Sequence, residues 1–246
     1  YRSWDTFYYA EAFKLWKKGG NWDKLAVANH EEKYRFLEIL CDNNHEKQSF
    51  YEVVNFYLAG TRFAVRGRYD IAVFMMYRVM ERISALCIQE YGIVPDKPDY
   101  PKLNMPEDTL ACDFKKICRE LYPHRSGSSF VLPDKIGFMH SLILNFLKGH
   151  PVIVKNKKKT AKEVLGEFCQ VSGFRNKSIF THGTQPLSKK DYNQIHNLSR
   201  SFISDFLKYK NTDSIEDFEK RLDFHDGSLS SRLKGKPPEC IIDMTP

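Results

Sequence analysis

The sequence predicts an all-α fold, and three observations support this prediction. Apolar residues recur every three or four positions in almost every segment, which is the spacing of an amphipathic helix. Glycines and prolines stand mainly between these segments, where helices end. Strand-like patterns are weak, because the best candidate, Val152-Ile153-Val154, is too short to found a sheet.

Four helices are predicted in the first 92 residues, and each is followed by residues that terminate helices. Their apolar positions fall on one face over residues 1–18, 31–41, 50–66 and 69–91. The terminating residues are Gly19-Gly20, Asp42-Asn43-Asn44, Gly67 and Gly92.

The middle of the chain alternates loops with shorter helices. Residues 95–106 hold four prolines and are predicted to form a loop or linker. Helices are predicted over 108–121, which stops at Pro123, and over 134–147, which begins after Pro133. The polar, basic segment 149–160 is predicted to be a solvated loop.

Two capping boxes mark the last long helices. Thr160 with Glu163 opens a helix that runs to His182-Gly183. Ser188 with Asp191 is a weaker example and opens a helix over 189–209. A short helix is predicted over 215–222, and the last two dozen residues are predicted to be extended.

Composition narrows the class of protein. The chain has 246 residues, a formal charge of +7 and a pI of about 9.0, which favour polyanionic partners. Its apolar runs are too short to cross a bilayer, so no membrane association is predicted. The six cysteines are scattered without a Cys-x-x-Cys pair, which favours reduced thiols in a cytoplasmic protein. The histidines lack ligand spacing, and neither a metal nor another cofactor is predicted.

The run from Arg175 to His182 is the strongest candidate for a reactive site. Seven positions return to nearly the same helix face, so the two side chains are expected on one stripe, about 10 Å apart. Arginine carries a planar, permanently charged guanidinium group that can bind a phosphate through two hydrogen bonds. Histidine exchanges protons near neutral pH. The pair therefore suits cleavage of a phosphodiester. The similar pair Arg119 and His124 is separated by about 500° of helix rotation and by Pro123, so it is interpreted as incidental.

The pattern Arg175-Asn176-x5-His182, near the end of the penultimate long helix of an all-α chain, resembles HEPN ribonuclease domains. The helix that follows Gly67-Arg68-Tyr69-Asp70 is similar to one in CRISPR-associated proteins that join a ring-nucleotide-sensing (CARF) domain to a HEPN domain. The resemblance is best over 50–92 and 160–209. It implies a HEPN-like multi-helix bundle over 46–210, with 95–158 as insertion-like helices and loops. Residues 1–45 would be an N-terminal helical extension, and 211–246 a mostly irregular C-terminal tail.

The resemblance also implies an activity: metal-independent endonucleolytic cleavage of RNA in antiviral defence, at a composite site made by a homodimer. Arg175 would hold the scissile phosphate, and Asn176 would orient it. His182 would transfer protons as the 2′-hydroxyl attacks and leaves a 2′,3′-cyclic phosphate. Lys177 is a candidate for binding the RNA substrate. The chain begins with Tyr1, so we expect the ring-nucleotide-sensing domain to lie upstream, outside this chain.

Less specific interpretations stay open at this point. Arg175 could be a surface arginine, His182 a residue that caps a helix carbonyl, and Asn176 an exposed helix residue. The chain would then be a catalytically silent all-α module that binds nucleic acid or protein. The lysines of 155–159 could steer RNA or simply form a solvated face.

Overall fold

The structure is a computed structural model, and it describes residues 31–41, 45–125, 130–156, 158–177 and 186–222. Within these ranges the chain forms eight α-helices and two short 3₁₀ turns but no strand, which confirms the all-α prediction. The α-helices are α3 (Glu31–Cys41), α4 (His45–Val65), α5 (Tyr69–Gln89), α6 (Glu107–Leu121), α7 (Phe138–Leu147), α8 (Ala161–Lys177), α9 (Lys189–Tyr209) and α10 (Ile215–Arg221). The 3₁₀ turns are Tyr100–Leu103 and Pro123–Arg125.

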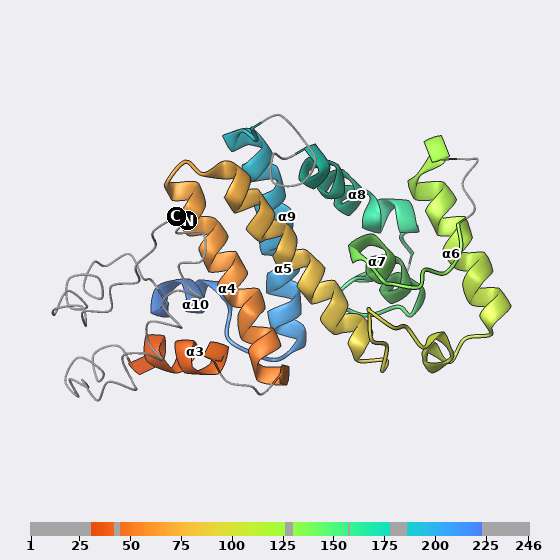
Figure 1. Cartoon of the computed structure of the whole chain (residues 1–246), viewed down its shortest axis with the longest axis horizontal. Coiled ribbons are helices and arrows are strands. Elements are labelled where there is room, and N and C mark those ends of the chain that lie inside the picture. Colours follow the sequence, from red (N-terminus) through yellow and green to blue (C-terminus); the bar gives the residue numbers. More distant parts are fainter. Residues whose placement is uncertain (1–30, 42–44, 126–129, 157, 178–185, 223–246) are drawn as a thin grey trace, which may run out of the picture.

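Helix α5 is the centre of the bundle. It packs against α4 and α9 on one side and against α7 and α8 on the other, as Figure 1 shows. Its buried face is therefore wider than the stripe of an ordinary surface helix, and it comprises Ala72, Val73, Met76, Tyr77, Val79, Met80, Ile83, Ser84, Cys87 and Ile88. A helix that buries several faces is held mainly by tertiary packing and only weakly by its own propensity.

Helices α4 and α5 form an antiparallel hairpin through a tight turn. Gly67 has a φ of 70°, in the left-handed region that favours glycine. The amide of Arg68 donates to the carbonyl of Phe63 at 2.9 Å, and that of Gly67 donates to Ala64 at 2.9 Å. These two bonds are the Schellman ending of α4, and they fix the point where α5 begins.

The hairpin is tightly packed at Gly60. A Cβ atom placed on Gly60 would lie 2.7 Å from the Cε of Met76, 3.2 Å from the Cβ of Met75 and 3.3 Å from the carbonyl oxygen of Ala72. The glycine therefore lets the two helices approach more closely than any side chain would allow.

Buried polar groups hold α7 against α5. The carbonyl oxygen of Ser84 accepts hydrogen bonds from the Ser141 hydroxyl at 2.7 Å and from the Asn145 amide at 2.9 Å. All three residues are at most 2% exposed. A buried polar group without a hydrogen-bond partner lowers the stability of the fold. These bonds therefore specify how the two helices pair.

Two predicted helix boundaries were wrong, each because of a tertiary contact. Helix α4 begins at His45, earlier than predicted, and Ser49 in its first turns is buried and accepts a hydrogen bond from Arg82 at 2.6 Å. Helix α7 begins at Phe138, later than predicted. The amide of Ile136 donates to the carbonyl of Pro95 at 2.8 Å, and this bond holds the preceding residues outside the helix.

The strand candidate is instead a buried turn. The amides of Ile153 and Val154 both donate to the carbonyl of His150, and Val152 and Ile153 are buried. Apolar character alone does not distinguish a short strand from a buried turn, so the pattern was ambiguous there.

The capping boxes are confirmed. Thr160 and Glu163 exchange the reciprocal bonds at the start of α8, and Ser188 and Asp191 do so at the start of α9. A further capping box, which was not predicted, is formed by Ser214 and Asp217 and opens α10. The helix predicted over 1–18 and the extended tail predicted at the C-terminus lie outside the described residues. None of the described helices is long and apolar enough to cross a membrane.

Candidate functional site

Arg175, the arginine of the predicted site, lies at the C-terminal end of α8. The backbone of Arg175, Asn176 and Lys177 forms the last turn of this helix. His182 lies outside the described residues, so its pairing with Arg175 stays a prediction.

Three aromatic and aliphatic side chains anchor α8. Leu165, Phe168 and Val171 are at most 7% exposed. The ring of Phe168 packs between those of Phe138 in α7 and Phe202 in α9, at centroid distances of 6.2 and 5.1 Å. Such edge-to-face contacts add to the apolar burial and fix the direction in which α8 runs.

The end of α8 lies beside the start of α9. The side chain of Gln194 donates to that of Gln170 at 3.1 Å, and the two helices run in opposite directions along their contact. From this bond α8 continues for about 10 Å to Lys177, and α9 extends back about 8 Å to Lys189. Figure 1 shows both ends on the same side of the bundle.

The N-terminal end of α5 lies beside the N-terminal end of α9 as well. An Oδ1 atom of Asp70 accepts a hydrogen bond from the Leu187 amide at 3.0 Å. The rings of Tyr69 and Tyr192 pack with centroids 6.0 Å apart. The C-terminal end of α8 and the N-terminal ends of α5 and α9 therefore meet at one end of the bundle. Sequence reasoning missed this arrangement, because Asp70 and Leu187 are far apart along the chain and no local pattern links them.

A polar network that sequence reasoning also missed lies deeper between α4, α9 and α10. His196 stacks on Tyr57 and its Nε2 atom lies 3.1 Å from the Tyr57 hydroxyl. Arg200 donates to that hydroxyl at 3.0 Å, to Glu219 at 3.1 Å and to Glu216 at 2.7 Å. Burial and the nearby guanidinium of Arg200 lower the pKa of His196. A neutral, hydrogen-bonded imidazole in this place connects α4 with α9 and is not suited to donate a proton.

A second histidine is buried where α5 and α9 end. His150 is 1% exposed, its Nδ1 accepts from the Val152 amide at 3.3 Å, and its Nε2 lies 3.2 Å from a carboxylate oxygen of Glu90. Glu90 also accepts from the Tyr209 hydroxyl at 2.7 Å and from Lys210. Burial alone would raise the pKa of Glu90, but these hydrogen bonds outweigh it and lower the pKa. This cluster closes the end of the bundle opposite to Arg175.

One buried and two half-buried histidines make stability depend on pH. Burial lowers the pKa values of His140, His150 and His196 in the folded chain from an ordinary 6.5. Below about pH 6.5 the unfolded chain takes up protons that the folded chain refuses, so the free energy of unfolding falls as pH falls. Above pH 6.5 these groups contribute no pH dependence. We therefore expect the free energy of unfolding to fall as the pH is lowered below 6.5.

Urea unfolding at pH 7.5, 6.5 and 5.5 checks this expectation. The control is His140→Phe, which keeps the ring contact with Phe114 but cannot titrate and should flatten the pH dependence. A free energy of unfolding that is constant from pH 7.5 to 5.5 contradicts the expectation.

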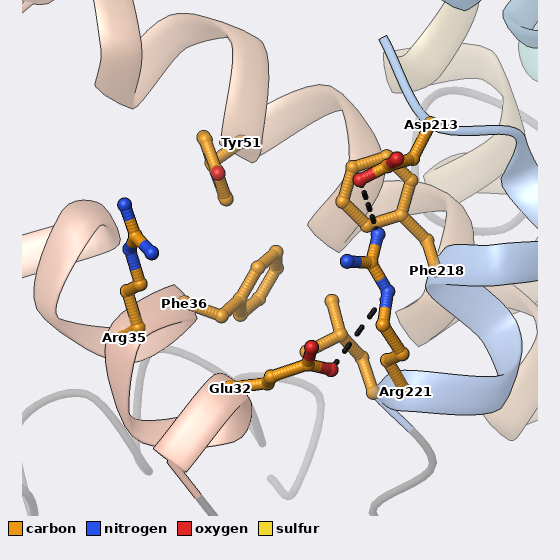
Figure 2. A pocket seen from close by; sticks show the side chains of 8 residues that line it. Glu32, Arg35, Phe36, Tyr51, Asp213, Phe218 and Arg221 are labelled. Carbon is orange, nitrogen blue, oxygen red and sulfur yellow. Dashed lines mark hydrogen bonds and ion pairs between the residues drawn. The ribbon is translucent and has the colours of Figure 1, made fainter.

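Two pockets formed by described residues lie away from the end of α8. Figure 2 shows one of about 230 Å³ between α3, α4 and α10, walled by the rings of Phe36, Tyr51 and Phe218. Arg221 on one side pairs with Asp213 and Glu32, and Arg35 stands on the other side. Two guanidinium groups and two carboxylates leave this pocket without net charge. It is therefore not selective for a polyanion.

The other pocket, of about 240 Å³, lies between the first half of α8 and the second half of α9. Its charged side chains are mixed in sign: Lys155, Lys159, Glu163, Glu167 and Asp205. Among the described residues no group of three or more His, Cys, Asp or Glu side chains is placed to hold a metal ion.

A known protein family matches most of the helical bundle. The family model described as the Csm6 HEPN domain matches residues 41–207. This range is more than half of the chain, and it includes the positions of Arg175 and His182. No curated protein matches the sequence.

Proposed function

The chain belongs to the Csm6 HEPN domain family of CRISPR-associated proteins, and on this premise we propose that it is a metal-independent endoribonuclease acting on single-stranded RNA. The observation that carries the proposal is the family match over 41–207, a range that contains the Arg175–His182 motif. The position of Arg175 in the last turn of α8, beside the starts of two other helices, supports it. The net charge of +7 is also in accord with a polyanionic substrate.

Each proposed site residue has a distinct task. The Arg175 guanidinium binds the nonbridging oxygens of the scissile phosphate and stabilises the charge that develops on them. Asn176 orients the same phosphate through its side-chain amide. His182 transfers the proton, and Lys177 attracts the adjoining RNA backbone.

The reaction is an internal displacement. The 2′-oxygen attacks phosphorus and loses its proton, the new P–O2′ bond forms, and the P–O5′ bond breaks. The leaving 5′-oxygen takes up a proton, so the products are a 2′,3′-cyclic phosphate and a 5′-hydroxyl. The step consumes no water and needs no oxidant or reductant. DNA is not a substrate, because it lacks the nucleophile.

A homodimer supplies what one chain lacks. One imidazole near neutral pH is either a base or an acid at a given moment, whereas the displacement needs both. Two copies facing each other across a two-fold axis bring two Arg175 residues and two His182 residues to one composite site. The enzyme would act in the cytoplasm as part of CRISPR antiviral defence, with a ring-nucleotide-sensing domain upstream of this chain.

The proposal is tested with labelled single-stranded RNA in buffer containing EDTA. We expect cleavage that survives chelation, products that end in a 2′,3′-cyclic phosphate, and no cleavage at a nucleotide whose 2′-hydroxyl is replaced by hydrogen. Cleavage that requires a divalent cation, or that continues at the 2′-deoxy nucleotide, contradicts the mechanism. Binding of RNA without cleavage at any protein concentration instead identifies a catalytically silent module.

A further inference from the structure

Three exposed cations lie at the end of the bundle where α8 stops. Arg68 precedes the first turn of α5, and Lys189 and Lys190 are the first two residues of α9. We name these three residues the basic rim. Arg68 is far in sequence from the two lysines. The hydrogen bond of Leu187 with Asp70 and the ring contact of Tyr69 with Tyr192 bring them to the same end of the bundle.

The positions of the rim residues are fixed by the backbone. Arg68 follows Gly67 in the Schellman turn, so its place is set by two hydrogen bonds at the end of α4. Lys189 and Lys190 follow the Ser188 cap, whose amide donates to Asp191 at 2.8 Å. The rim therefore presents its cations from rigid elements, as a site that positions a ligand requires.

The three cations of the rim outnumber the two carboxylates in the first turns of α5 and α9, Asp70 and Asp191. An oxygen of Asp70 accepts from the Leu187 amide, and one of Asp191 accepts from the amide and the hydroxyl of Ser188. These acids stabilise backbone groups. Within the described part of the chain, none of Arg68, Lys189 and Lys190 forms an ion pair.

Cations in several other parts of the bundle are paired. Lys155 pairs with Asp205, Lys210 with Glu90, and Arg200 with Glu216 and Glu219. The rim contrasts with these pairs, and it adjoins the last turn of α8, which carries Arg175 and Lys177. The N-terminal ends of α5 and α9 add partial positive charge at the same place, and the C-terminal end of α8 adds partial negative charge there.

We propose that the basic rim binds the phosphate backbone of the RNA beside the scissile nucleotide and sets the register of the strand on the site. This inference rests on the proposed function for its substrate, and on the described residues for its location. The rim makes no contact with the reacting atoms, so its residues are positioning residues. Phosphate contacts of this kind carry affinity and orientation but little sequence preference.

The test measures binding separately from cleavage. In the His182→Ala background, fluorescence anisotropy with a labelled single-stranded RNA compares the intact rim with the triple variant Arg68→Ala, Lys189→Ala, Lys190→Ala. We expect at least a tenfold weaker affinity at about 0.1 M salt. The slope of log binding constant against log salt concentration should be smaller in magnitude by about 2, because each phosphate contact on a single strand contributes about 0.7 to it.

The matched control is Lys116→Ala, Arg119→Ala, Lys135→Ala, which removes the same charge from exposed positions in α6 and just before α7. Figure 1 shows α6 on the far side of the bundle. The control should change affinity by less than about twofold if contact, and not total charge, is responsible. Equal losses in both triple variants, or an unchanged affinity in the rim variant, overturn the proposal.

Cleavage assays distinguish a failure of the proposed ribonuclease function from a failure of the rim proposal. With His182 intact, the rim variant should raise KM and leave kcat nearly unchanged, because it removes binding that the ground state and the transition state share. If the wild-type chain binds RNA through the rim but never cleaves it, the proposed function fails and the rim stands. If cleavage depends on Arg175 and His182 while the rim variant behaves like the control, only the rim proposal fails.

Discussion

Replacing Arg175 with alanine is expected to lower the rate of RNA cleavage by about two to three orders of magnitude, because removing one donor that stabilises developing negative charge has an effect of this size. His182→Ala should lower it by about two to four orders, the range for general acid–base catalysis. Both variants should leave the midpoint of thermal unfolding nearly unchanged. Cleavage of a labelled single-stranded RNA in EDTA and circular dichroism provide the two measurements.

The conservative variant Arg175→Lys sharpens this prediction. Lysine keeps the charge but loses the planar fork, so we expect an activity between those of the arginine and alanine forms. The matched control is Arg119→Ala, which removes the arginine of the incidental Arg119–His124 pair. The structure ends α6 at Leu121 and interrupts that pair, so the control should retain wild-type activity. Unchanged cleavage in both Arg175→Ala and His182→Ala would refute the assignment of the site.

The largest change in stability is expected at Gly60. Valine there would place its Cβ within 2.7–3.3 Å of Met76, Met75 and Ala72, and the flexible end of Met76 is the only one of these neighbours that moves cheaply. Forcing α4 and α5 apart should lower the free energy of unfolding by about 2–3 kcal/mol, at the upper end of the range for overpacking. Urea unfolding at pH 7.5 measures the change.

Gly166 in α8 supplies the opposite case. A Cβ atom there meets nothing within 4 Å, so Gly166→Ala should raise the free energy of unfolding by about 0.5–1 kcal/mol through helix propensity alone. A glycine substitution that stabilises α8 and one that destabilises α4 would together attribute the Gly60 effect to packing. Equal effects of Gly60→Val and Gly166→Val would show that packing at Gly60 is not tight.

The helices were predictable from sequence because local signals agree with the fold. The capping boxes at Thr160 and Ser188 and the terminating residue Gly67 stand where the structure begins or ends helices. Prediction was wrong at the starts of α4 and α7, where long-range bonds to Ser49 and from Ile136 decide the outcome. Such contacts join residues with no local pattern, so no periodicity indicates them.

The candidate site was predictable only in part. The Arg175–His182 spacing gave the motif, and the structure adds that α8 ends beside the starts of α5 and α9. That arrangement depends on the contacts of Asp70 with Leu187 and of Tyr69 with Tyr192, which no local sequence pattern links. The network of His196, Tyr57 and Arg200 was missed for the same reason, because no local pattern links the three residues.

The central place of α5 has a consequence for how the chain is made. Its partner α4 precedes it in the chain, so the α4–α5 hairpin can form early, but α9 is synthesised roughly 100 residues later. At about 5–20 residues per second, the ribosome leaves the face of α5 that α9 covers exposed for about 5–20 seconds. That face includes Met76, whose carbonyl oxygen accepts a bond from Ser199 of α9 at 3.4 Å. The face of α5 that α9 covers is therefore buried only after translation of α9 is complete.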